Sequence, residues 1–347
     1  MTRTWMRTEI AEQSQAVAAT VEEVRRRAEQ VRTAMTGRRR ILLVARGSSD
    51  NAAVYGRYLV ETRLGIPAAL AAPSVATHYH ARLDLSDTLV VSVSQSGRTE
   101  EIVAVQRWAA ELGAATIGIS NDASSPLATE SDVPLTTQAG VERAVPATKS
   151  YSAQLAALAG LAAALDGGEV LWELLARVPA ELSRLESAEE GVAGAVDLLA
   201  ESDDVLVTGR GLGFGTALEV GLKLEETCLR PVRGLSYADL RHGPIAVVGP
   251  GLTAVVVAAP DGPMLAPIVE LAGDLAGRGA RVLGVGGDAA LAAASSYHVP
   301  GPELPEPVAP IGLIVPAQLV VESLARRLGL DPDAPRGLSK VTATDPR

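Results

Sequence analysis

The chain has 347 residues, of which 47% are hydrophobic and only 3% aromatic, and its formal net charge is −10. This length and apolar content suffice for the core of one large domain or of two ordinary ones. The acidic balance argues against nucleic acid or an anionic membrane as a partner, although a local cluster of backbone N–H groups can still bind phosphate. The single cysteine, Cys228, excludes an internal disulfide and favours a reducing compartment.

The N-terminus carries Arg3, Arg7 and Glu9 and no apolar run of the kind that a signal peptide needs, so we expect a cytoplasmic protein. The apolar stretch 155–165 is too short and too rich in Ala and Gly to span a bilayer. We therefore expect no membrane partner.

Short apolar runs that alternate with helical patterns fill the first half of the chain. Residues 1–37 follow helical spacing. Buried strands are then predicted at 41–45, near 70, at 88–93 and at 115–119, with helices from about 50 to 65 and over 100–112. This alternation predicts an α/β fold with a doubly wound parallel sheet.

The second half repeats this plan about 160 residues later. Strands are predicted at 204–208, 252–258 and 281–285, and helices at 217–229, 269–277 and 316–328. The repeat indicates an internal duplication with two sheet subdomains. The predicted parts are a helical segment 1–37, a phosphate-binding subdomain 38–166, connecting helices 167–199, a second subdomain 200–330 and a C-terminal tail 331–347.

A hydroxyl-rich turn, residues 94–99, follows the strand 88–93 and leads directly into a helix. Ligands of such sheets lie at the carboxyl ends of strands, and helix N-termini offer unpaired N–H groups. The groups that could surround one phosphate are Ser94, Gln95, Ser96 and Thr99, with Ser48 and Ser49 of the equivalent turn after the first strand as a second wall. The alternative is that Ser96 or Thr99 simply caps the helix.

The helix 217–229 carries Glu219, Lys223 and Glu226 on one face, at spacings of four and three. A solvated, salt-bridged face is the ordinary interpretation. However, the repeat places a buried helix here, and a carboxylate beside an ammonium in a cleft would suit proton transfer. His242 follows in a rigid turn before Gly243-Pro244; taken alone, such a histidine is more often structural or exposed than catalytic.

Two other kinds of site are not expected. The glycine-rich run 209–215 lacks the G-x-G-x-x-G spacing, which argues against a nicotinamide cofactor. His78 and His80 have no cysteine or carboxylate pair at metal-ligand spacing, so we predict no metal site. We therefore expect a protein that uses neither a cofactor nor a metal.

In their order and spacing, these motifs resemble the sugar isomerase (SIS) family, most closely the isomerase half of glucosamine-6-phosphate synthase and the stand-alone glucosamine-6-phosphate deaminases. The resemblance covers nearly the whole chain. The segments that carry it are 7–13, Gly47-Ser48-Ser49, 94–99, Ala147-Thr148-Lys149, 217–226, Arg241-His242-Gly243-Pro244 and 335–342.

The resemblance implies two SIS subdomains and a homodimer with the active site at its interface. It assigns phosphate binding to Ser49, Ser94, Gln95, Ser96 and Thr99, with Ser48 beside them. It implies that Glu226 is the base that moves a proton between C1 and C2 of the open-chain sugar, with Lys223 beside it. His242 of the neighbouring subunit would help to open the ring, and Lys340 of the tail would close over the sugar.

Some residues depart from the family pattern. Arg98 stands where an acidic residue is usual, Ala147 replaces a serine near the sugar, and Arg230 or Arg233 could change how the C2 substituent is read. No glutaminase domain precedes residue 1, which favours deamination over synthesis.

The leading hypothesis is an isomerising glucosamine-6-phosphate deaminase. One alternative is a dehydratase that acts on N-acetylglucosamine 6-phosphate, in which the same base removes the C2 proton and the C3 hydroxyl leaves. Cleavage of a ketosamine phosphate is a third enzymatic possibility. The non-enzymatic alternative is a sugar-phosphate sensor, which the joint presence of Glu226, Lys223, His242 and Lys340 argues against.

Overall fold

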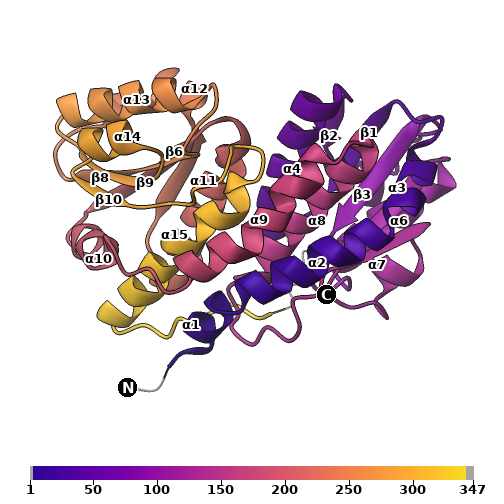
Figure 1. Cartoon of the computed structure of the whole chain (residues 1–347), viewed down its shortest axis with the longest axis horizontal. Coiled ribbons are helices and arrows are strands. Elements are labelled where there is room, and N and C mark those ends of the chain that lie inside the picture. The colour runs from indigo at the N-terminus through magenta and orange to yellow at the C-terminus, as the bar shows by residue number, and fades with distance from the viewer. Residues whose placement is uncertain (1–2, 341–347) are drawn as a thin grey trace. The chain divides into compact units, whose positions relative to one another are not determined.

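The computed structural model describes residues 3–340, which form two compact units (Figure 1). Unit 1 takes in residues 3–14, 143–148 and 177–338, and unit 2 takes in residues 15–142, 149–176 and 339–340. Neither unit is continuous in sequence, because the chain passes from one to the other several times. Residues 341–347 of the predicted tail lie outside the described residues.

Unit 2 contains a parallel sheet in the order β2-β1-β3-β4-β5. Its strands are β1 (Arg40–Val44), β2 (Ala68–Leu70), β3 (Thr88–Val93), β4 (Ala115–Ser120) and β5 (Val133–Thr136). Every residue of β3 and β4 is buried, which explains their continuous apolar runs. The strand β5 was not predicted, because it is short and contains Pro134, a residue that edge strands tolerate.

Helices cover this sheet. They are α3 (Ala28–Met35), α4 (Ser48–Leu64), α5 (Ser74–Thr77), α6 (Glu100–Glu111), α7 (Pro126–Thr129) and α8 (Lys149–Asp166), while α2 (Gln13–Arg26) and α9 (Val170–Leu185) each cross from one unit to the other. Side chains of α6 pack on the face that presents Val44 and Val90. The helix α8 packs on α4 and is buried all round, as its Ala- and Leu-rich sequence allows.

Unit 1 contains a second parallel sheet, in the order β10-β9-β8-β6-β7. Its strands are β6 (Asp204–Gly209), β7 (Val232–Ser236), β8 (Leu252–Ala258), β9 (Arg281–Gly286) and β10 (Tyr297–Val299). Taken in the reverse direction, this order repeats that of the first sheet strand for strand. The predicted internal duplication and the α/β fold class with two doubly wound sheets are therefore confirmed.

The helices of unit 1 are α1 (Trp5–Ile10), α10 (Val192–Ala200), α11 (Phe214–Cys228), α12 (Tyr237–Arg241), α13 (Leu265–Gly277), α14 (Ala289–Ala294) and α15 (Ala309–Arg327), with the 3-10 turns η1 (Gly211–Gly213) and η2 (Pro244–Val247). Figure 1 shows α11 and α15 next to each other, and the two helices are in contact.

By length and composition α15 could cross a membrane, but 89% of its apolar window is buried in the structure, as in a core helix.

The helices at the two ends of the chain differ from the predictions. The last helix was expected to begin at Pro316, in the position that proline favours at helix starts. In fact Pro316 lies inside α15, among buried apolar neighbours, although an interior proline costs about 3 kcal/mol through the lost hydrogen bond and the clash of its ring. The N-terminal segment is also helical as expected, but it is divided into three helices rather than forming one.

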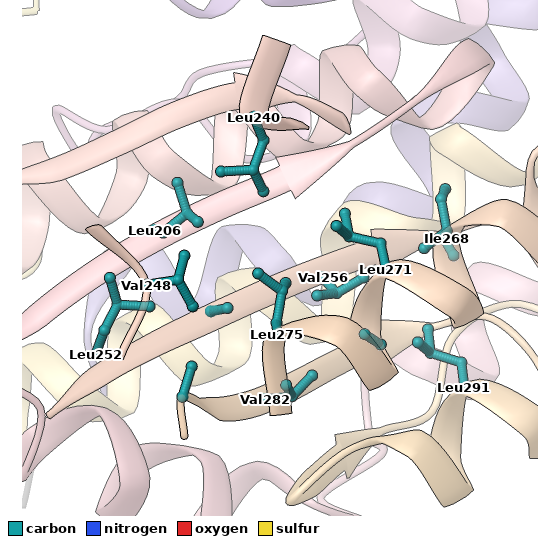
Figure 2. Packing of buried hydrophobic residues seen from close by; sticks show 14 residues of the cluster. Leu206, Leu240, Val248, Leu252, Val256, Ile268, Leu271, Leu275, Val282 and Leu291 are labelled. Carbon is teal, nitrogen blue, oxygen red and sulfur yellow. The ribbon is translucent and has the colours of Figure 1, made fainter. Parts of the chain in front are cut away.

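The core of the second sheet lies between its strands and α13. Figure 2 shows Leu271 and Leu275 of α13 packed beside Val256 of β8, with Leu206 of β6 in the same cluster. Leu271 is fully buried. Its spacing from Leu275 and Ile268 places all three on the face that α13 turns toward the sheet.

We expect Leu271→Ala to lower the free energy of unfolding by about 2–5 kcal/mol. The substitution leaves a cavity where the leucine side chain was, and the parallel sheet beside it cannot move in to fill it. Urea denaturation followed by circular dichroism measures the change. Glu270→Ala is the matched control, since Glu270 is exposed on the same helix and its loss should change stability by less than about 0.5 kcal/mol. Equal effects of the two substitutions would contradict this packing.

Candidate functional site

The turn after β3 is held by its own backbone. The N–H of Ser94 donates to the carbonyl of Ile119 (3.0 Å), and the N–H of Gly97 donates to the carbonyl of Ser94 (3.1 Å). Gly97 has φ +61°, and a Cβ there would lie 2.1 Å from the Ser125 Oγ. Only glycine therefore fits this position.

The hydroxyls of the turn do not cap the helix that follows. Thr99 occupies the N-cap position of α6, but its side chain makes no capping hydrogen bond; instead its Oγ1 lies 3.3 Å from the Ser94 Oγ. The Ser96 Oγ accepts a hydrogen bond from the N–H of Arg98 within the turn (3.2 Å). Because a hydroxyl pair uses one of its two protons in its mutual bond, one proton of Ser94 and Thr99 can still be donated to a ligand.

The second turn lies at the same edge of the sheet. The strands β1 and β3 pair in parallel with Val44 opposite Ser92, so the segments after both strands leave at the carboxyl edge. Ser48 opens α4 and is half-buried, and Ser49 beside it is buried. The sheet order reverses direction between β1 and β3, which is where doubly wound sheets bind ligands.

An arginine joins the two turns. Arg46 follows β1, and its Nε and Nη2 donate to the two carboxylate oxygens of Glu101, at 2.8 and 3.0 Å. Glu101 lies in the first turn of α6 and is buried. Two parallel bonds of this kind fix orientation as well as distance. This pair has no local signature in the sequence, because its partners are 55 residues apart.

Arg98, the departure from the family pattern, is directed to the neighbouring loop. Its Nη2 lies 2.7 Å from the Asp122 carboxylate. Hydrogen bonds from Ser124 and then from Arg98 lower the pKa of Asp122 to about 2. The guanidinium therefore already has a carboxylate partner beside the hydroxyl-rich turn 94–99.

Asn121 connects the same turn to the segment before α8. Its N–H donates to the carbonyl of Gln95, and its Nδ2 donates to the carbonyl of Gly140 (2.7 Å). Its Oδ1 accepts from the Thr137 hydroxyl and from the N–H of Ala139, both at 3.0 Å. A pocket of about 490 Å³ opens beside this asparagine, and none of the predicted site residues lines it.

In the second repeat, a carboxylate lies between the two equivalent turns. Gly262, in the turn after β8, has φ +92°, and a Cβ there would meet the Glu306 Oε2 at 2.3 Å. The other carboxylate oxygen lies 3.6 Å from the Cβ position of Gly211, in the turn after β6. Burial and the charge of Asp261 raise the pKa of Glu306. This turn lacks hydroxyls, as the sequence showed, and the protein's own carboxylate stands against it.

The helix α11 buries the charged residues that the sequence placed on one face. Lys223 is 1% exposed and Glu219 is fully buried, so this face is not the solvated one of the ordinary interpretation. The Nζ of Lys223 lies 2.5 Å from the Glu226 Oε2 and 3.4 Å from the Glu219 Oε1. Glu226 is about a quarter exposed, which leaves its carboxylate accessible while the lysine holds it.

The remaining predicted residues lie at element ends. His242 is the C-cap of α12 and is exposed in unit 1. Lys340 belongs to unit 2, where its Nζ lies 2.6 Å from the Glu142 Oε2. The structure thus brings Lys340 and the two hydroxyl-bearing turns into one unit, and Lys223, Glu226 and His242 into the other. Within residues 3–340, no three His, Cys, Asp or Glu side chains gather as metal ligands would.

We expect Gly97→Ala to abolish phosphate binding, because the new methyl group would collide with Ser125 and the left-handed backbone would cost about 1–2 kcal/mol. Calorimetric titration with a hexose 6-phosphate measures the binding. Gly65→Ala is the matched control, since Gly65 has φ +64° with nothing near its Cβ position. It should lose only the stability that the backbone strain costs and keep full affinity; equal affinity in both variants would contradict the assignment.

A protein-family model of the SIS domain matches residues 34–164. The glutamine–fructose-6-phosphate aminotransferase (isomerizing) of Aquifex aeolicus is 33% identical over 311 residues, and that of Methanothermobacter thermautotrophicus is 34% identical over 309 residues. Each match covers 88% of this chain and 52% of the relative, so the chain spans about half the length of these aminotransferases.

Solved structures match over more than nine-tenths of the chain. A protein from Silicibacter pomeroyi DSS-3 described as a phosphosugar isomerase is 32% identical, with a TM-score of 0.85 and coverage of 95% of this chain and 100% of that one. The glucosamine-6-phosphate deaminase of Thermotoga maritima is 27% identical, with a TM-score of 0.71 and coverage of 93% and 99%. Together with the duplicated sheets and the hydroxyl turn, these matches show that the chain belongs to the SIS domain family.

Proposed function

We propose that this protein is an enzyme of aldose–ketose phosphate chemistry, and specifically an isomerising glucosamine-6-phosphate deaminase. The observation that carries the proposal is the buried Lys223 held between Glu219 and Glu226 on α11. Burying charged side chains is costly unless they pair with one another. Here Lys223 and Glu219 are buried, and the carboxylate of Glu226 is left partly exposed. A phosphate sensor would need only the turns of unit 2.

In the proposed reaction, the turns at 47–49 and 94–99 bind the phosphate of the open-chain sugar through Ser48, Ser49, Ser94, Gln95, Ser96 and Thr99. Glu226 removes the proton from C2 and returns it to C1, while the oxygen on C1 gains a proton and the amine on C2 loses one. A carboxylate in this role needs a position between the two carbons, and the ion pair with Lys223 supplies a fixed one. The product is the C2 imine, which water hydrolyses to fructose 6-phosphate and ammonia.

The amine as substrate group is supported by the relatives. The Thermotoga maritima structure, matched over 99% of its length, is a glucosamine-6-phosphate deaminase, and the aminotransferases act on fructose 6-phosphate. A single proton transfer between adjacent carbons underlies isomerisation and deamination alike. Ala147, which departs from the family pattern, is a position at which recognition of the C2 substituent would differ. The guanidinium of Arg230 is committed elsewhere, because it donates to the carbonyls of Ala200 and Ser202.

His242 completes the proposal. It is exposed at the end of α12 and precedes Gly243, whose φ of +123° fixes the turn. We propose that it opens the sugar ring in the site of a second copy of the chain, within a homodimer. A histidine suits this step because it exchanges protons near neutral pH.

Purified protein given glucosamine 6-phosphate should release ammonia and fructose 6-phosphate in equal amounts. Glu226→Gln should lower kcat by about 10²- to 10⁴-fold while the substrate still binds, because the amide keeps the shape and loses the base. Enzyme-coupled assays of both products measure the reaction. Glu225→Gln is the matched control, since Glu225 is the exposed neighbour on the same helix and should leave kcat unchanged.

Absence of ammonia at high enzyme concentration would overturn the deaminase assignment. Mass spectrometry of reactions with N-acetylglucosamine 6-phosphate then decides among the alternatives. A product lighter by one water would indicate the dehydratase, and tight binding without any product from either sugar would indicate a sensor.

A further inference from the structure

The chain uses lysine at only three positions. Of its 31 Lys and Arg residues, 28 are arginine, and the lysines are Lys149, Lys223 and Lys340. Arginine stays protonated in proteins, whereas the pKa of an amine shifts readily and the amine can act as base or nucleophile. Lys149 and Lys223 are buried, and Lys340 is only 27% exposed in an ion pair.

The partner of Lys340 is a carboxylate inside unit 2. The side chain of Glu142 is fully buried, and its Oε2 lies 2.6 Å from the Lys340 Nζ. The N–H of Ser150 donates to its Oε1 (3.0 Å), and the Ser150 hydroxyl donates to its Oε2 (2.6 Å). Ser150 lies in the first turn of α8, where the helix dipole favours an anion. Glu142 therefore joins the C-terminal segment to the start of the central helix of its unit.

The charge of Glu142 is maintained by these partners. Burial alone would raise the pKa of its carboxyl group, but the charge and hydrogen bond of Lys340 and the hydrogen bonds of Ser150 outweigh burial and lower it. The carboxylate is thus ionised at neutral pH and attracts the lysine as a full charge. Such an ion pair restrains the amine, because the fully buried carboxylate holds it at 2.6 Å and is itself fixed by Ser150.

The segment that carries Glu142 is also connected to the phosphate turn. Asn121 donates one hydrogen bond to the carbonyl of Gln95 in that turn, through its backbone, and another to the carbonyl of Gly140, through its amide. Gly140 is two residues before Glu142. A continuous path of hydrogen bonds and covalent bonds thus runs from the turn through Asn121 and Glu142 to Lys340, all within unit 2.

We infer that Glu142 is a positioning residue, which holds the amine of Lys340 at a fixed place relative to the phosphate turn. Its effect on turnover rests on the proposed function, but its hold on Lys340 does not. A carboxylate that sits behind a functional amine sets the direction of its lone pair or protons, and small displacements of such groups cost about 10²-fold in rate. Glu142 itself needs no contact with the substrate.

The first experiment measures how readily the amine of Lys340 is reached by a reagent, and it does not depend on activity. The folded full-length protein is acetylated with a water-soluble N-hydroxysuccinimide ester, and the modification of each lysine is followed by peptide mass spectrometry. Three lysines make the readout simple, and the buried Lys223 of unit 1 serves as the internal reference. Glu142→Gln should raise the acetylation rate of Lys340 about tenfold relative to wild type. An unchanged rate in a folded variant would overturn the inference.

Glu130→Gln is the matched control for this measurement. Glu130 is a carboxylate of unit 2 that pairs with Arg107 at 2.5 Å, at the surface. Its loss should leave the labelling of Lys340 and the turnover unchanged. If Glu142→Gln fails to fold by circular dichroism, Glu142→Asp replaces it, because aspartate keeps the charge and shortens the reach by one carbon. The acetylation of Lys340 should then rise in the same direction.

The second experiment tests whether the position of the Lys340 amine affects turnover. With glucosamine 6-phosphate, Glu142→Gln should lower kcat about 10- to 100-fold with little change in KM. Lys340→Arg, which keeps a cation for Glu142, should be at least as impaired. Faster acetylation with wild-type kcat would overturn the positioning role. Faster acetylation in a protein whose wild type releases no ammonia would support the hold on Lys340 and reject the proposed function alone.

Discussion

Parallel pairing between β1 and β3, and its counterpart between β6 and β8, fixes where polar groups can gather in each unit. Helices cover these sheets, so the strand interiors are apolar and cannot carry chemistry. Parallel strands all end at the same edge, and hydroxyls, amides and charges therefore collect in the turns there. The reversal of strand order between β1 and β3 separates the helices that follow them and leaves room for a ligand.

The two units use this constraint differently. In unit 2, the edge carries neutral hydroxyls on turns that Arg46 and Glu101 hold together, an arrangement suited to a phosphate dianion. In unit 1, the charge lies on the body of a helix, where Lys223 is enclosed by two carboxylates of α11. Neutral donors can bind a charged ligand without a fixed counter-charge. The ion pairs of Lys223, by contrast, hold a carboxylate that can accept a proton in a defined orientation.

Sequence reasoning identified the elements that have a local signature. The turn at Ser94 was found because hydroxyls interrupt an apolar run. For Lys223 the ordinary interpretation was a solvated face, and only its place in a repeat argued for the burial that the structure has. The strands β5, β7 and β10 were not predicted, because each is short and lies at or near a sheet edge, where packing demands few apolar residues. Asn121 could have been found, since it follows a strand that neighbours β3. Glu142 could not: next to Arg143 it looks like a solvated loop charge, and its burial depends on a lysine 198 residues away.

The carboxylate of Glu306 shows how a duplicated fold lost its symmetry. It stands between the turns that, in the first repeat, are proposed to surround a phosphate, and the chain itself delivers it. A tethered group acts at an effective concentration in the millimolar range or above, which a free metabolite must exceed to compete. The second repeat thus carries a covalently attached anion of its own. The two repeats thus present equivalent edges, and in the second an acidic side chain of the chain itself stands between the turns that carry hydroxyls in the first.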